Sequence, residues 1–394
     1  MLKKIPHYGY VLTDDTGMPR YWAAAWCLLI GGSLAESSLK HRLSNIEALY
    51  KYSELDHPVG FLDDALSDQN LPVLEELLES YFVTLRNVPE VGATAEQRWR
   101  EAVAFTREIS ERLSRTPELS ERFADLGIRL ERLDRLYGQL RMTRRTAPNF
   151  VRALPASVMS ELYDAVLPGS RTNPFKTTAA QWRAYAAFLL LLHQGLRRGE
   201  ALSLPADFLK SERTKLGMQF WLNVRTNVYE DDDPRHSTPS IKTLSSIRQI
   251  PVSSATATAL FTYLENYRGR QNHSFFLSSA KNLPLSAEGL NYFFKILSAS
   301  MSTATMKILN DRTGMTSISP HDLRHTAAVV RMKQLLVKGD PMPEALQKIR
   351  SFFGWAANST MPHLYAKAAF EERLSTIWGD AFDDRTAMLM ELPQ

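Results

Sequence analysis

Histidine and arginine occur together in the stretch HDLRHT, which begins at His321 directly after Pro320. Histidine exchanges protons near neutral pH, and the permanently charged guanidinium of arginine binds anionic oxygens. Residues three apart share one face of a helix, so His321 and Arg324 would point the same way. A structural interpretation is also open, in which Pro320 starts a helix, Asp322 suits the positive end of its dipole and His321 caps it.

Three further stretches carry residue types that can act on an anion or a proton. Arg197 and Glu200 in GLRRGEAL are three residues apart, so they would share a helical face, either within a site or as a structural ion pair. Lys242 in SIKTLSSIRQIPV stands between two strand-like segments, where it could also be an ordinary exposed turn residue. Trp355 and Tyr365 follow in FFGWAANSTMPHLYAKA. None of these stretches is specific by itself.

The elements that would position these residues are mainly helical. Apolar residues recur three and four apart in SLAESSLKHRLSNIEALYKYSEL, LPVLEELLESYFVTLRNV and AEQRWREAVAFTREISERLSR, which predicts a small helical domain in the first half. SVMSELYDAVL and AAQWRAYAAFLLLLHQG predict further helices, and the second is apolar enough for the centre of a core. The alternation in MQFWLNVR and IRQIPVS predicts two strands. Alternating residues before an Asp-Asp-Thr-Gly turn suit a hairpin or arm that packs on the helical domain.

Length and composition are those of a globular protein. The 394 residues suffice for two or three domains, with 44% hydrophobic and 23% charged residues. The longest apolar stretches are too short to cross a bilayer as helices. The single cysteine, Cys27, excludes an intramolecular disulfide and a multi-cysteine metal site, so we expect no redox chemistry. A cytoplasmic protein is the natural expectation.

Basic residues gather in one stretch, although the net charge is only +4. Arg141, Arg144, Arg145 and Arg152 stand with no acidic residue between them. A solvated helix end followed by a linker would explain such a run. A linker that follows DNA would explain it too, because neutralising phosphates needs several cations along one path. We predict that these four arginines bind DNA between two domains.

Taken in order, the separate stretches resemble the catalytic domain of the tyrosine recombinases, the phage integrase family of site-specific DNA recombinases. The resemblance runs from about residue 155 to about residue 370. It covers an Arg-x-x-Glu box, a lysine in a β-hairpin, a His-x-x-Arg box and a later tyrosine. It implies seven catalytic residues, namely Arg197, Glu200, Lys242, His321, Arg324, Trp355 and Tyr365.

The same resemblance implies a mainly α fold with a small β-sheet. A helical N-terminal domain like the family's core-binding domain would precede a mixed α/β tyrosine-recombinase catalytic domain. The tail would pack on its own domain or be exchanged between protomers. The expected segments are an arm or hairpin at 1–30, the helical DNA-binding domain at 31–140, a basic linker at 141–154, the catalytic domain at 155–370 and the tail at 371–394.

The implied chemistry is a metal-independent phosphoryl transfer through a 3′-phosphotyrosyl intermediate. Tyr365 would attack phosphorus and later serve as the leaving group. Arg197 and Arg324 would bind the negative charge that develops on the non-bridging oxygens. His321 can accept the phenol proton or hold a phosphate oxygen, and Lys242 can protonate the departing 5′ oxygen.

Three other residues have supporting parts in this scheme. Glu200 would orient a basic partner, because a carboxylate that faces phosphate is repelled. Trp355 stands where many members have histidine, and its indole can donate a hydrogen bond but cannot transfer a proton. His325 follows Arg324, and we expect it to point elsewhere on the helix in a supporting role.

The resemblance also implies the partners of the protein. They are double-stranded DNA and further copies of the chain, as a tetramer on paired DNA sites, with no cofactor, no membrane and room for accessory DNA-bending proteins. The protein would be bacterial and cytoplasmic, and associated with the nucleoid when bound to DNA. It would serve integration, excision, resolution, inversion or transposition. Two alternatives stay open: a DNA-binding protein on the same scaffold that does not cut, and a type IB topoisomerase.

Overall fold

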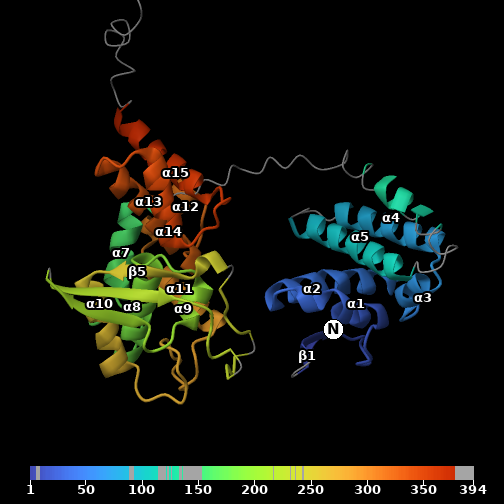
Figure 1. The fold of residues 1–394 in the computed structure, drawn as a ribbon, viewed down its shortest axis with the longest axis horizontal. Helices are drawn as coiled ribbons and strands as arrows, with labels where there is room; N and C mark the ends of the chain where they lie inside the picture. Colours follow the sequence, from blue (N-terminus) through green and yellow to red (C-terminus); the bar gives the residue numbers. More distant parts are fainter. Residues whose placement is uncertain are drawn as a thin grey trace, which may run out of the picture. The chain divides into compact units, whose positions relative to one another are not determined.

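The chain forms two compact units, Met1–Thr146 and Ala147–Gln394, in a computed structural model (Figure 1). The residues that the structure describes are 1–5, 9–87, 93–113, 121, 124–125, 127–132, 135, 153–215, 217–230, 232–235, 237–241 and 244–377. Lys242, the four arginines predicted to bind DNA and the tail beyond residue 377 lie outside the described residues. No helix in the described ranges is long and apolar enough to span a membrane.

The first unit is a helical bundle with a hairpin packed on it. Its elements are β1 (Leu2–Ile5), β2 (Gly9–Leu12), α1 (Tyr21–Leu29), the short η1 (Gly31–Ser33), α2 (Glu36–Ser53), α3 (Phe61–Ser67), α4 (Leu71–Asn87) and α5 (Ala93–Leu113). The two strands pair antiparallel and both contact α2, and Trp26, Tyr50 and Phe105 fill the core. The hairpin before the Asp14 turn, its packing on the helices, and the three helices predicted from apolar spacing are therefore confirmed.

The second unit holds a small sheet and the remaining helices. Its elements are α7 (Ala156–Val166), α8 (Thr178–Leu192), α9 (Arg198–Ser203), β3 (Leu209–Thr214), β4 (Gly217–Val224), η2 (Leu244–Ser246), β5 (Arg248–Val252), α10 (Ser254–Thr262), η3 (Tyr263–Tyr267), α11 (Ala287–Ser300), α12 (Thr303–Thr313), α13 (Pro320–Val337), α14 (Met342–Phe353) and α15 (Met361–Ile377). One core cluster joins α7, α8, the sheet, α10 and α11, and a second joins α13, α14 and α15. The mainly α fold with small sheets is as predicted.

The sheet has three antiparallel strands in the order β3-β4-β5. Leu222 faces Ile250 across the β4–β5 pair, and both side chains are fully buried. The two strands predicted from alternation are thus confirmed. The edge strand β3 was not predicted, because its sequence LKSERT is mostly polar and its only buried side chain is that of Leu209.

Helix α8 ends shortly before Arg197, and α13 carries His321 and Arg324. The side chains of α8 are buried along most of its length, as its unbroken apolar sequence predicted. Helix α13 begins at Pro320, and Ser319 is its N-cap, with the Asp322 carboxylate accepting hydrogen bonds from the Ser319 N–H and hydroxyl at 2.7 Å each. The cap is therefore Ser319 and not His321, which leaves the His321 ring exposed for another role.

Candidate functional site

Six of the seven sequence-predicted catalytic residues belong to one part of the second unit. Arg197 is the N-cap of α9, and Glu200 lies in its first turn. His321 and Arg324 lie in the first two turns of α13. Trp355 follows the end of α14, and Tyr365 lies on α15. Ion pairs, hydrogen bonds and ring stacking tie five of these residues to one another, and His321 adjoins them through His325.

The Glu200 carboxylate is the centre of the charged part of the site. Its side chain is fully buried, and it pairs with Arg197 at 2.6 Å, Arg248 at 3.0 Å and Arg324 at 3.7 Å. It also accepts a hydrogen bond from the Arg197 backbone N–H at 2.9 Å, which closes a capping box on α9. Burial alone would raise the pKa of Glu200, but the hydrogen bond and charge of Arg248 and the charges of Arg324 and Arg197 lower it. The carboxylate is therefore ionised and holds three guanidiniums.

Arg248 is a residue of this network that the sequence reasoning missed. Its guanidinium donates to both Glu200 oxygens, and Nε donates to the Phe352 carbonyl at 2.8 Å. The side chain is only 6% exposed. A signal was present in SIRQIPV, since an arginine that begins a buried strand needs a partner for its charge.

Arg324 is the most buried of the three arginines that pair with Glu200. Its Nη2 donates to the Phe353 carbonyl at 2.7 Å, and its Nη1 donates to the Gly195 carbonyl. Burial and the charge of Arg197 lower its pKa to about 9, against the opposing effect of Glu200, so it stays charged at neutral pH. A guanidinium has five N–H donors, and two carbonyl bonds leave donors for a phosphate oxygen.

Two glycines allow the backbone to reach these arginines. Gly195 accepts from Arg324, and Gly354 accepts from Arg197 Nη2 at 3.3 Å. Both have φ near +60°, the left-handed region that suits glycine. A Cβ on Gly354 would meet the Arg248 guanidinium at 2.8 Å, and one on Gly195 would overlap the Phe353 ring. Larger residues would therefore push the carbonyls away from the arginines.

Aromatic rings pack beside the charged part of the site. The Trp355 ring stacks on Phe353 at 4.9 Å and on Tyr365 at 5.1 Å, nearly parallel in both pairs. The Arg324 guanidinium lies 5.7 Å from the Trp355 ring centroid. Trp355 thus holds the Tyr365 ring in a fixed plane beside Arg324.

The Tyr365 side chain is buried, with 1% of the residue exposed. Its hydroxyl lies 2.6 Å from Nδ1 of His325. Burial raises the pKa of the phenol to about 12, against the opposing charges of Arg324 and Arg197. Burial and the neighbouring His321 lower the pKa of His325 to about 4. The expectation that His325 points elsewhere on the helix is wrong, because α15 crosses α13 where residue 325 meets the tyrosine.

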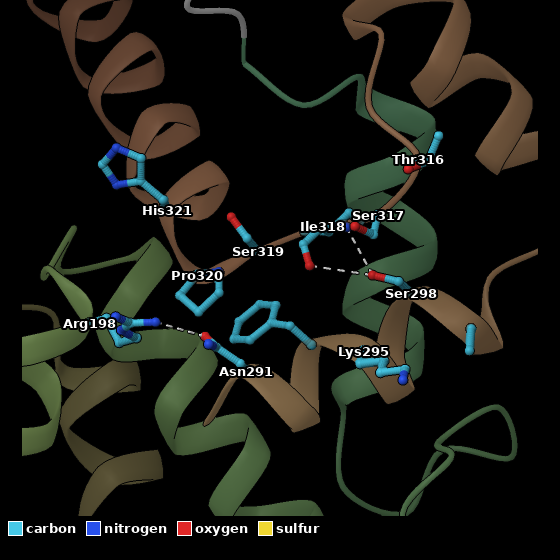
Figure 2. A pocket seen from close by; sticks show the side chains of 12 residues that line it. Arg198, Asn291, Lys295, Ser298, Thr316, Ser317, Ile318, Ser319, Pro320 and His321 are labelled. Carbon is cyan, nitrogen blue, oxygen red and sulfur yellow. Dashed lines mark hydrogen bonds between the residues drawn. The ribbon is translucent and has the colours of Figure 1, made fainter. Parts of the chain in front are cut away.

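His321 lies at the exposed edge of the site. Its ring meets the His325 ring edge-on, with centroids 4.1 Å apart. Its side chain lines a pocket of about 890 Å³, which Arg198, Asn291 and Lys295 also line (Figure 2). Arg198 donates to the Asn291 side chain at 3.2 Å within it. A negatively charged ligand that reached His321 would also contact the positive charges of Arg198 and Lys295.

The arrangement suits the binding of a tetrahedral anion next to a phenol. Arg197, with 22% of its side chain exposed, offers the accessible guanidinium, and Arg324 lies deeper. Among the described residues, no group of three or more His, Cys, Asp or Glu side chains is placed to hold a metal ion. The two guanidiniums are cationic donors that can bind an anion.

Comparison with known proteins gives two matches in sequence. Residues 154–372 match the sequence model of the phage integrase family. A tyrosine recombinase XerC-like protein from Caldanaerobacter subterraneus subsp. tengcongensis is 25% identical over 200 residues, which are 50% of this chain and 48% of that protein. The chain thus spans about half the length of the curated relative that it matches.

Solved structures also align with the chain. The Tn1549 transposon integrase in complex with transposon right end DNA has 16% identity and a TM-score of 0.48, over 91% of this chain and 99% of that one. The XerH site-specific recombinase bound to difH substrate has 12% identity and a TM-score of 0.49, over 87% of this chain and 80% of that one.

Proposed function

Because the chain belongs to the phage integrase family, we propose that it is a site-specific DNA recombinase. It would cleave and rejoin strands through a 3′-phosphotyrosyl intermediate, for integration, excision, resolution, inversion or transposition of a DNA element. The observation that supports this most directly is that Arg197 and Arg324 pair with one ionised carboxylate, Glu200, while the Tyr365 phenol lies close enough to both arginines to feel their charges. An anion site beside a phenol is what attack on a phosphodiester requires.

The scissile phosphate would bind first to the accessible groups. Arg197 and the exposed His321 can contact its non-bridging oxygens, and Arg324 can contact them from below. The cations Arg198 and Lys295 beside His321 would bind the neighbouring backbone phosphates. Glu200 would stay away from the DNA and fix the arginines in place.

The covalent step exchanges one phosphate ester for another. The Tyr365 oxygen gives up its proton to a neighbouring base and forms a bond to phosphorus while the bond to the 5′ oxygen breaks. The 5′ oxygen takes a proton, for which Lys242 is the proposed donor. Attack by a 5′ hydroxyl of another strand reverses the step and releases the tyrosine. No bond energy is lost, so no cofactor is needed. Because Tyr365 is buried, the segments that cover it would have to shift when DNA binds.

The partners follow from the same scheme. Double-stranded DNA is the substrate, and Arg141, Arg144, Arg145 and Arg152 would contact its phosphates from the linker. Exchange between two duplexes cuts four strands, each joined to one tyrosine, so a tetramer on paired sites is the proposed assembly. The protein would act in the bacterial cytoplasm and associate with the nucleoid through its DNA sites.

Covalent trapping tests the proposal. The full chain would be incubated with labelled DNA that flanks its own gene, including nicked duplexes from which the cut fragment diffuses away. A denaturant-resistant adduct is expected with the wild type and not with Tyr365→Phe. Tyr267→Phe is the matched control, since it keeps the ring that stacks on Trp182 and should leave the adduct unchanged.

Other outcomes would favour the two alternatives. Specific DNA binding with no adduct on any nicked duplex would favour a DNA-binding protein that does not cut. Relaxation of a supercoiled plasmid that lacks any specific site would favour a type IB topoisomerase. An adduct that survives in Tyr365→Phe would refute the assignment of the nucleophile.

A further inference from the structure

The shortest contact to the Tyr365 hydroxyl comes from a residue outside the predicted catalytic set. Nδ1 of His325 lies 2.6 Å from the phenol oxygen, and the two ring centroids are 5.7 Å apart. His325 lies one residue after Arg324, so the same turn of α13 provides both the buried guanidinium and the hydrogen-bond partner of the phenol. This distance is that of a strong hydrogen bond.

We propose that His325, rather than His321, is the general base that takes the Tyr365 proton as the phenol attacks DNA, an inference that rests on the proposed recombinase function. A base must touch the proton that it removes. The hydrogen bond to the phenol places His325 in that position. His321 is exposed and meets the edge of the His325 ring, on the side of the pocket in Figure 2.

The surroundings of His325 keep it in the form that a base needs. Burial and the nearby His321 lower its pKa to about 4, while Asp322 opposes this and Arg324 adds to it. From α15 it faces the Tyr365 phenol, whose pKa is raised to about 12. At neutral pH the imidazole is therefore neutral and the phenol protonated. The phenol then donates to Nδ1, and the imidazole carries its own hydrogen on Nε2.

The proton moves together with the bond to phosphorus. A phenol with a raised pKa holds its proton until its oxygen begins to bond to phosphorus, and then the proton passes to Nδ1. The 5′ oxygen leaves and takes a proton from a different group. The imidazolium that forms is stabilised by the added negative charge on the phosphate. In the reverse step His325 returns the proton to the tyrosine oxygen as the 5′ hydroxyl attacks.

Single-turnover cleavage of a nicked duplex by the full chain tests whether His325 acts as a base or only holds the Tyr365 ring in position. His325→Gln keeps an acceptor for the phenol but cannot take its proton, and His325→Ala removes both functions. We expect both variants to cleave about 10²- to 10⁴-fold more slowly than the wild type. His363→Gln on the exposed face of α15 is the matched control and should cleave at the wild-type rate. A His325→Gln variant that cleaves at the wild-type rate would overturn the proposal.

A nucleophile of lower pKa provides a readout that a structural role would not move. Tyr365 would be replaced by a ring-fluorinated tyrosine in the wild type, in His325→Gln and in His321→Gln. Since an acidic phenol needs less help from a base, fluorination should raise the cleavage rate of His325→Gln more than that of the other two. Equal effects in all three, or a larger effect in His321→Gln, would refute His325 as the base. Absence of any adduct in the wild type would instead refute the recombinase function, and the base with it.

Discussion

Glu200→Gln removes a negative charge that faces three guanidiniums and leaves the size of the side chain unchanged. In the wild type, the carboxylate pairs with Arg197, Arg248 and Arg324 at 2.6, 3.0 and 3.7 Å, with no exposure of its own side chain. The amide can still accept from the Arg197 backbone N–H, so the capping box can persist. Its NH₂ group, however, must face a buried arginine.

The expected cost follows from the burial of these groups. Removing one partner of a buried ion pair leaves an uncompensated charge and destabilises by about 3–5 kcal/mol. Arg248 and Arg324 set this value, because their side chains are only 6% and 2% exposed. Arg197, at 22% exposure, can turn toward water and adds less. We therefore expect the free energy of unfolding of the second unit to fall by about 3–5 kcal/mol.

Native-state hydrogen exchange on the full chain measures the free energy of unfolding of the second unit separately from that of the first unit. The amides of α8, α9 and α13 should exchange about 10²- to 10⁴-fold faster in Glu200→Gln, since each factor of ten corresponds to about 1.4 kcal/mol. Glu344→Gln is the control, because it breaks only the exposed pair with Lys348 and should change exchange less than threefold. If Glu200→Gln behaves like that control, the carboxylate does not organise the arginines.

Three further predictions concern other parts of the molecule. Arg331→Met should lower the free energy of unfolding by about 1.5–3 kcal/mol, because it removes the bond at 2.6 Å to the His193 carbonyl, and faster amide exchange after α8 would show this. Since the folded pKa of His325 is about 4, below the ordinary 6.5, only the unfolded chain binds its proton as pH falls from about 6.5 to 4. Stability should fall by about 3 kcal/mol more in the wild type than in His325→Gln, as urea titrations across this range would reveal. Arg144→Gln with Arg145→Gln should reduce the slope of log affinity for DNA against log salt by about 0.9 for each phosphate that is no longer neutralised, whereas an unchanged slope would place both arginines away from DNA.

Most of the fold followed from periodicity. The long helices α2, α4 and α5 and the strands β4 and β5 were predicted from their apolar spacing, and α8 was predicted from its unbroken apolar sequence. The exposed edge strand β3 was missed, since it carries too few buried residues to produce alternation. Local spacing also gave no indication of how α13, α14 and α15 pack together, because that contact joins residues far apart in the chain.

The residue types of the site could be predicted from the sequence, but the contacts between these residues could not. The positions of Arg197, Glu200, Arg324 and Tyr365 came from separate stretches and a family resemblance. The carbonyls of Gly195 and Gly354 that hold the two arginines depend on backbone conformation rather than on a side chain. The contact of His325 with Tyr365 depends on where α15 crosses α13, and spacing along α13 cannot give that crossing.

The charges of the site agree with a base at position 325. Arg197, Arg248 and Arg324 carry three positive charges and Glu200 one negative charge, so the buried network has a net charge of 3 − 1 = +2. A phosphodiester carries one negative charge, and attack by a phenol that has lost its proton adds a second. The phenol proton stays in the site as the imidazolium of His325, so the network, the phosphate and His325 together carry the same total charge before and during attack. Transfer to His325 therefore lets the second negative charge on the phosphate develop with a compensating cation in contact with the tyrosine oxygen.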